Sequence, residues 1–341
     1  IISGTNKDPD ILRNIRIGDP ADSLNSITVN AVNMKKEPAS YTRIGEVLSF
    51  FHKPDIAYYG GDHNQRMRVC SPYGERMVCG TSFAAPWIAR KMAYLIEVMR
   101  MPRAVAKALL IDSAVSWRKS DDDLKKIGYG VVPIRIEDIL HCRDDEIKCL
   151  ISGVSKEYDT YNYQFPVPTA EDKYPYIARA ILCYYPCCSR EQGVDYTDTE
   201  MDMHFGRVYE KADHKWAIKS INQNTQDEEG YCHTEKEARR LYRKWDNVKW
   251  MTEYLKEKAK GKKIYDGHDW GISIKTKERL ERRMGNGLPF GLVITLKAID
   301  HVNRLDQFIQ ACSYKGWLVQ KVDIRQHLDV YEKAEENIHL E

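Results

Sequence analysis

The stretch GTSFAAP, from Gly80 to Pro86, sets one hydroxyl, that of Ser82, among glycine and small residues at the head of a predicted helix. Residues 82–100 continue as a run with apolar residues on nearly every side, which is typical of a helix threaded through a core. A helix N-terminus presents unpaired N–H groups and the positive end of a dipole, and both favour negative charge. Ser82 is therefore a candidate nucleophile, which needs a base, usually a histidine oriented by a carboxylate.

The composition is that of a globular protein without a dominant charge. The chain has 341 residues, of which 43% are hydrophobic, and its 52 basic and 50 acidic side chains give a net charge of +2. This balance gives no reason to expect nucleic acid or a membrane surface as partner, and no apolar run reaches the roughly 18 residues of a membrane span. The nine cysteines, an odd number without zinc-ribbon spacing, predict free thiols, no metal site and a reducing, cytoplasmic compartment.

The first part of the chain has the pattern of an α/β fold. Short apolar segments at residues 1–4, 26–32 and 55–59 alternate with helical runs, as they do in a parallel sheet covered by helices. We assign residues 1–151 to this domain, and expect a polar, proline-containing connector after it.

The second part, residues 164–339, has the pattern of a β-rich domain. Several alternating or continuous β-type runs separated by turn signals predict a β-sandwich of jelly-roll kind. Residues 234–263 interrupt these runs as a charged helical insertion that carries Trp245 and Trp250. A basic helix with tryptophans suits nucleic acid, but the interspersed acids favour a solvated helix docked on the sandwich.

GTSFAAP resembles the serine motif of the subtilisin-like serine proteases (subtilases), Gly-Thr-Ser-x-Ala-x-Pro, at every fixed position. The flanking order is also similar. SLNSITVNAVN at residues 23–33 resembles the family's Val-Gly-Ala-Val strand with Asn30 in place of glycine, and SFFHKPDIAYYG at 49–60 resembles its Lys-Pro-Asp stretch. GYG at 128–130 resembles the Gly-x-Gly element that follows the serine helices.

The opening IISGTN resembles the family's strand that ends in Ala-Ala-Gly-Asn, with Thr5 where the family has glycine. The resemblance implies that Asn6 donates to the oxyanion together with the Ser82 N–H, and that Ser3, Gly4 and Thr5 form one wall of the primary specificity pocket. It implies an endopeptidase that forms an acyl-enzyme on Ser82 with a peptide or protein substrate. No cofactor is expected, and the structural calcium of many subtilases has no identifiable site in this sequence.

The family's aspartate and histidine motifs, which precede the oxyanion asparagine, are absent. His52 and His63 lie before Ser82 in predicted loops, outside any such motif. We therefore expect the C-terminal portion of a catalytic domain without its N-terminal strands, inactive alone and completed by an upstream segment of the same protein. The open sheet edge that this leaves is expected to favour association.

Two other functions compete with this interpretation. A non-catalytic subtilase-like scaffold would bind a protein or nucleic-acid partner through the sandwich and the basic helix, and loss of the aspartate or histidine upstream would support it. A different serine hydrolase is disfavoured, because the serine motif does not match the Gly-x-Ser-x-Gly elbow of lipases and esterases.

Overall fold

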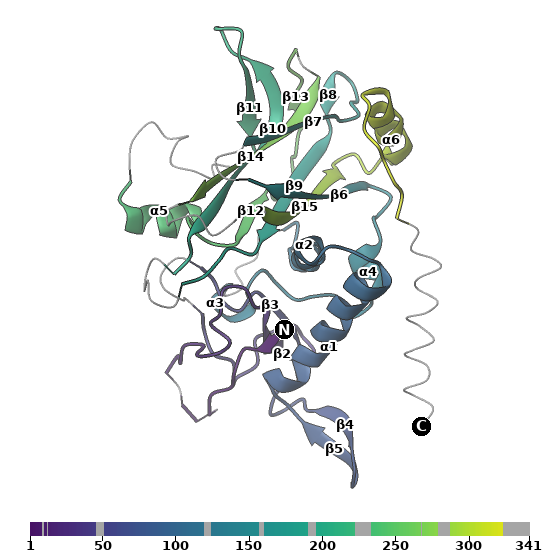
Figure 1. Cartoon of the computed structure of the whole chain (residues 1–341). Coiled ribbons are helices and arrows are strands. Elements are labelled where there is room, and N and C mark those ends of the chain that lie inside the picture. Colours follow the sequence, from purple (N-terminus) through teal and green to yellow (C-terminus); the bar gives the residue numbers. More distant parts are fainter. Residues whose placement is uncertain are drawn as a thin grey trace. The chain divides into compact units, whose positions relative to one another are not determined.

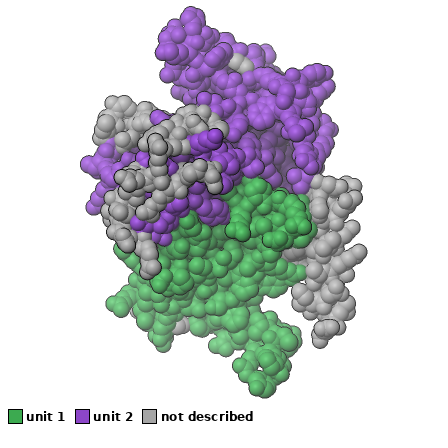
Figure 2. Space-filling view, in the orientation of Figure 1, with its two compact units in different colours: residues 1–116, 120–139 green, residues 117–119, 140–341 purple. Residues whose placement is uncertain are grey.

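The computed structural model describes residues 1–8, 10–11, 13–45, 51–118, 124–156, 160–189, 196–221, 233–266, 268–278 and 287–322. The chain divides into two compact units, shown in different colours in Figure 2. Unit 1 comprises residues 1–116 and 120–139, and unit 2 comprises residues 117–119 and 140–341.

Unit 1 is built on a parallel sheet of three strands, in the order β1 (Ile2–Ser3), β2 (Thr28–Val32) and β3 (Ile56–Tyr59). Every residue of the central strand β2 is buried, as expected where a parallel sheet is covered on both faces. The three predicted strands of this region are therefore confirmed, because each short apolar segment lies in the sheet.

Helices and a hairpin complete unit 1 (Figure 1). The predicted helix at residues 82–100 is α1 (Thr81–Ala93), which continues as the π-helical turn η1 (Tyr94–Val98) and is followed by α2 (Arg103–Ala114). Two short helices follow, α3 (Leu124–Ile127) and α4 (Glu137–Leu140). The last residue of α4, Leu140, belongs to unit 2. The antiparallel hairpin β4 (Met67–Ser71) and β5 (Gly74–Val78), which the sequence analysis did not predict, leads directly to the GTSFAAP stretch.

Unit 2 contains two antiparallel four-stranded sheets. The first has the order β12 (Val248–Thr252), β9 (Tyr176–Tyr184), β15 (Leu288–Ala298), β6 (Glu146–Ser155). The second has the order β11 (Trp216–Ser220), β10 (Thr199–Glu210), β14 (Asp269–Glu278), β7 (Thr160–Pro166). A two-stranded ribbon, β8 (Lys173–Tyr174) with β13 (Lys262–Lys263), and two helices, α5 (Glu235–Tyr242) and α6 (Leu305–Tyr314), complete the unit.

Both sheets of unit 2 contribute to one hydrophobic core. Leu182 and Leu292 of the first sheet belong to the same buried cluster as Met203 and Phe205 of the second, and α6 adds Phe308. The sheets are not closed into a barrel. Burial on one shared face explains why the β-type runs of the sequence were recognisable.

Two details of the predicted organisation differ in the structure. The helical insertion at residues 234–263 is helical only over α5, because β12 pairs with β9 and takes the following residues into a sheet. The residue at which we divided the chain, Ile151, lies inside β6, which pairs with β15 far along the chain. A pairing over this sequence distance leaves no local signal, so the compact units divide near residue 140 instead.

Candidate functional site

Ser82 lies in the first turn of α1 with its side chain exposed. The turn before it depends on Gly80, whose φ of 154° is a backbone conformation that L side chains rarely adopt. The Gly80 N–H donates to the carbonyl of Gly60 at 3.0 Å, which fixes the turn to the residues that follow β3. A Cβ on Gly60 would lie 2.8 Å from the Gly80 oxygen, so this approach needs glycine on both sides.

Asn6, which follows β1 in the chain, contacts this turn through its side chain. Its Oδ1 accepts hydrogen bonds from the backbone N–H of Thr81 at 3.1 Å and from the Thr81 hydroxyl at 2.9 Å. A backbone N–H can only donate, so the oxygen of the carboxamide must face Thr81. The carboxamide nitrogen Nδ2 has no hydrogen-bond partner among the described residues, and it lies beside Gly80, 3.3 Å from where a Cβ on that glycine would be.

The structure thus brings Asn6 and the Ser82 turn together, although 75 residues separate Asn6 from Thr81. Sequence reasoning gave Asn6 and Ser82 but missed Thr81 as the residue that orients the carboxamide. The signal was present, since Thr81 is a fixed position of the serine motif.

Ser3, Gly4 and Thr5 lead from β1 to Asn6. Ser3 pairs with Val29 in the parallel sheet, and the Gly4 N–H donates to the Val29 carbonyl at 2.7 Å. A Cβ on Gly4 would lie only 1.8 Å from Oδ1 of Asn30, a buried atom without a hydrogen-bond partner among the described residues. That Ser3, Gly4 and Thr5 form one wall of a primary specificity pocket stays a prediction.

Thr5 has a φ of 64°, in the left-handed region. A β-branched residue is a genuine outlier there, whereas glycine adopts it without strain. This conformation explains physically why a glycine would be the expected residue directly before Asn6, and Thr5 partly compensates by donating its hydroxyl to the Gly4 carbonyl at 2.6 Å.

Tyr41 contacts the residues after β3 to which the turn before Ser82 is bonded, and the sequence analysis did not identify it. Its hydroxyl contacts the carbonyls of Gly61 at 2.7 Å and Gly60 at 3.1 Å. Burial, with the nearby Cys79 and Asp62, raises the pKa of Tyr41 well above its usual value. The phenol is therefore a neutral donor that holds the turn, and not a base.

No histidine is placed as the base of Ser82 within the described ranges. His63 packs its ring edge-on against Tyr41, with centroids 5.8 Å apart, and its backbone N–H donates to Asp62. His52 is half-buried beside Lys53 in the chain. The Ser82 hydroxyl makes no hydrogen bond in this part of the chain, so the groups that would activate it are not among these residues.

The Lys-Pro-Asp stretch, residues 53–55, forms a buried ion cluster directly before β3. Asp55 lies 2.6 Å from Nζ of Lys53 and 3.2 Å from Nζ of Lys107, and accepts the Thr28 N–H at 2.8 Å. Burial alone would raise the pKa of Asp55, but Lys107, Lys53 and the Thr28 N–H outweigh it and hold the pKa below its usual value. This cluster joins α2 to the sheet and is structural.

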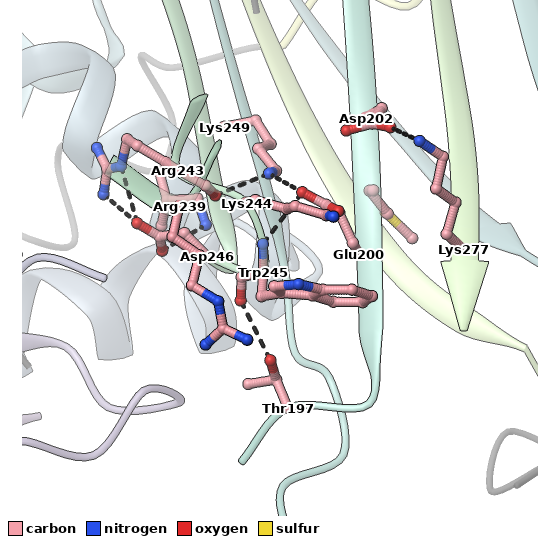
Figure 3. A network of polar contacts seen from close by, with 12 residues as sticks. Thr197, Glu200, Asp202, Arg239, Arg243, Lys244, Trp245, Asp246, Lys249 and Lys277 are labelled. Atoms are coloured by element: carbon pink, nitrogen blue, oxygen red, sulfur yellow. Dashed lines mark hydrogen bonds and ion pairs between the residues drawn. The ribbon is translucent and has the colours of Figure 1, made fainter. Parts of the chain in front are cut away.

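A second buried polar network lies in unit 2 (Figure 3). Glu200 of β10 accepts from Nζ of Lys249 at 2.8 Å and from the Trp245 N–H at 3.0 Å, and Arg243 donates to Asp246 at 2.8 Å. Glu200 and Lys249 are almost fully buried, and their mutual pairing offsets the cost of desolvation. The network anchors the residues after α5 and is not a second candidate site.

Neither a metal centre nor a membrane helix is found in the part of the chain that the structure describes. No three His, Cys, Asp or Glu residues there could together hold a metal ion. No described helix is both long and apolar enough to cross a bilayer. The described cysteines are all free thiols.

With this geometry in hand, comparison with known proteins gives one family. Residues 1–130 match the Subtilase family. The match covers Asn6, the GTSFAAP stretch and the Gly-x-Gly element, and it therefore confirms the resemblance for residues 1–130. We call these residues the subtilase segment. No curated protein matches the chain.

Solved structures similar to the chain include three proteases. The epidermin leader peptide processing serine protease from Staphylococcus aureus is 19% identical, with 36% of this chain and 32% of that chain covered and a TM-score of 0.30. The prenylagaramide maturation protease PagA is 22% identical, with 36% and 44% covered and a TM-score of 0.30. A mutant of the PatA protease domain is 20% identical, with 36% and 42% covered and a TM-score of 0.28. The chain spans about a third of the length of the first and less than half of the others.

Proposed function

We propose that the subtilase segment supplies the nucleophile and the oxyanion hole of a serine endopeptidase. The observation that carries the proposal is the double hydrogen bond from Thr81 to Oδ1 of Asn6, which leaves Nδ2 free beside the turn that carries Ser82. An oxyanion hole needs donors fixed in advance where negative charge develops.

In the proposed reaction the Ser82 hydroxyl attacks the carbonyl carbon of a peptide bond. The Ser82 N–H at the helix N-terminus and Nδ2 of Asn6 donate to the oxyanion of the tetrahedral intermediate. The amine then leaves, and water hydrolyses the acyl-enzyme. One such donor accounts for about 3–4 kcal/mol of transition-state stabilisation, a figure measured on a subtilisin.

The base and its carboxylate are proposed to come from residues outside this sequence. Support comes from the Ser82 hydroxyl, which makes no hydrogen bond among the described residues, and from the absence of a histidine motif in the sequence. Without its histidine a triad enzyme loses about a millionfold in turnover. Residues 1–341 alone should therefore be close to inert.

Ser3, Gly4 and Thr5 are proposed to line the primary specificity pocket, because they precede Asn6 on the same strand end. Unit 2 is proposed to be a jelly-roll accessory domain. Apart from the β10–β11 hairpin, which lies within one sheet, strands of the two sheets alternate along the chain: β6, β9, β12 and β15 lie in one, and β7, β10, β11 and β14 in the other. Such alternation is the pattern of two interleaved Greek keys.

A reducing, cytoplasmic compartment also remains part of the proposal. Disulfides mapped in native protein would contradict it.

Labelling with a fluorophosphonate probe tests the proposed chemistry. Three samples are compared: residues 1–341, the chain extended upstream through the aspartate and histidine motifs, and the extended chain with Ser82→Ala. We expect labelling of the extended wild type alone. A folded extended chain that takes no label would contradict the protease and support the non-catalytic scaffold.

A further inference from the structure

One end of unit 2 carries cations and aromatic rings that the proposed protease chemistry does not use. Strands β10 and β11 and the β8–β13 ribbon end there (Figure 1). We call the side chains that meet at this end the basic-aromatic patch: Lys173, Arg207, Tyr209, Lys219, Lys263 and Tyr265.

The four cations of the patch face one another across paired strands. Arg207 lies directly opposite Lys219 in the β10–β11 pair, and Lys173 lies directly opposite Lys263 in the β8–β13 ribbon. The two pairs are also joined, because Nη1 of Arg207 donates to the Lys263 carbonyl at 2.9 Å. Like charges directly opposite in a sheet destabilise it, so both pairs carry an electrostatic cost.

Carboxylates do not relieve this cost within the described ranges, where none of the four cations forms an ion pair. Lys262, the neighbour of Lys263, shows the contrast: it pairs with Glu253 at 2.6 Å, and burial lowers its pKa. Glu210, at the end of β10, pairs with His214 at 2.7 Å instead of with the patch. The patch is therefore a concentrated positive surface on a chain that is nearly neutral overall.

Aromatic rings lie among these cations. Above the Tyr265 ring, Cζ of Arg207 is 5.1 Å and Nζ of Lys263 is 5.3 Å from the centroid. The centroids of the Tyr209 and Tyr265 rings are 5.8 Å apart, and the two ring planes are inclined at 47°. These contacts hold Arg207 and Lys263 over the Tyr265 ring in a fixed arrangement instead of leaving them extended in water.

From this arrangement we propose that the patch binds single-stranded nucleic acid. Phosphate groups placed against the two cation pairs would neutralise their repulsion, and exposed bases would stack on the tyrosine rings. Cations with interleaved aromatics are the combination that single strands require, because every base offers a π-face. A duplex keeps its bases stacked inside, and an acidic peptide uses the cations but not the rings.

The test measures binding by residues 1–341 to fluorescent single strands of about 20 nucleotides, as DNA and as RNA, by anisotropy from roughly 50 to 200 mM salt. The patch variant is Lys173→Gln/Lys263→Gln, which changes two exposed side chains. The matched control is Lys156→Gln/Lys236→Gln, which removes the same charge from two exposed lysines of unit 2 outside the patch. Circular dichroism checks that both variants fold.

We expect the patch variant to bind about tenfold or more weakly at low salt, with a salt slope shallower by about 1.4, since each single-strand phosphate contact contributes about 0.7. The control should bind like wild type. Tyr265→Leu should weaken binding several-fold while leaving the salt slope unchanged.

Three results would overturn the proposal: no binding by wild type at low salt, equal loss in the control, or polyglutamate competing as well as the oligonucleotide. The last would identify an acidic polypeptide as the occupant. Because the readout is binding and not labelling of Ser82, failure of this proposal and failure of the proposed protease are distinguishable.

Discussion

Thr81 holds Asn6 with two of its own atoms, the backbone nitrogen and the hydroxyl, both directed at Oδ1. The residue next to the candidate nucleophile Ser82 therefore orients the side chain that we propose stabilises the oxyanion. This coupling links the two halves of the candidate site, because the helix turn that positions Ser82 also positions Asn6.

Removing the Asn6 carboxamide and removing the Thr81 hydroxyl that orients it should lower the labelling rate of Ser82 by different amounts. In the upstream-extended chain, Asn6→Leu should lower the rate of fluorophosphonate labelling by about 100-fold to 1,000-fold. Thr81→Val keeps the backbone donor and should cost about tenfold, the size of one hydrogen bond to a positioned group. Thr42→Val is the control, since its buried hydroxyl donates to Ala39 and not to Asn6. Equal labelling rates for Asn6→Leu and wild type would remove Asn6 from the site.

Thr5→Gly should stabilise the subtilase segment. The φ of 64° costs a β-branched residue strain that glycine lacks, and we expect a net gain of about 1 kcal/mol after the entropy of glycine is included. The hydrogen-exchange rates of the β2 amides measure this gain in stability. Lys36→Gly, at φ 66° but with an unbranched and exposed side chain, should gain less. A loss of protection in Thr5→Gly would show that the Thr5 hydroxyl outweighs the strain.

Gly4 and Asn30 should behave as a coupled pair. Gly4→Ala puts a Cβ 1.8 Å from Oδ1 of Asn30 and should destabilise unit 1 by about 1–3 kcal/mol, as overpacking does. Asn30→Gly removes that oxygen but also the donors to the Arg43 and Lys126 carbonyls. A double-mutant cycle by urea unfolding should therefore show that Gly4→Ala costs less in the Asn30→Gly background. Strict additivity would refute the predicted clash.

Asp55→Asn should destabilise unit 1 at neutral pH by about 3–5 kcal/mol, because it removes the carboxylate charge that pairs with the buried Lys53 and Lys107. The folded pKa of Asp55 lies below the unfolded value, so its stabilising effect is present above about pH 4 and is lost as pH falls through the folded pKa. The difference between wild type and Asp55→Asn in β2 hydrogen exchange should shrink on acidification. Asp213→Asn, at an exposed carboxylate of unit 2, should leave β2 exchange unchanged. A difference independent of pH would rule out the ionised cluster.

Part of the candidate site could be read from the sequence, and part could not. Ser82 was accessible because the serine motif is a local pattern, and Asn6 because its strand keeps the family order. Tyr41 was not, because its contact with Gly60 and Gly61 joins residues 19 and 20 positions apart that meet only in the folded chain. The basic-aromatic patch was also hidden, since Arg207 and Lys263 meet only through pairing between distant strands.

Alone, the sequence determined the parallel strands and buried helices of unit 1 and the β-rich character of unit 2, and it indicated Ser82 as the candidate nucleophile, because periodicity, helix termini and short motifs are local. Tertiary structure decided which strands pair, why β12 interrupts the expected helix, and how Thr81 aims the Asn6 carboxamide. Those outcomes depend on burial and hydrogen bonds between residues far apart in the chain, whose free energy exists only once the sheets have assembled.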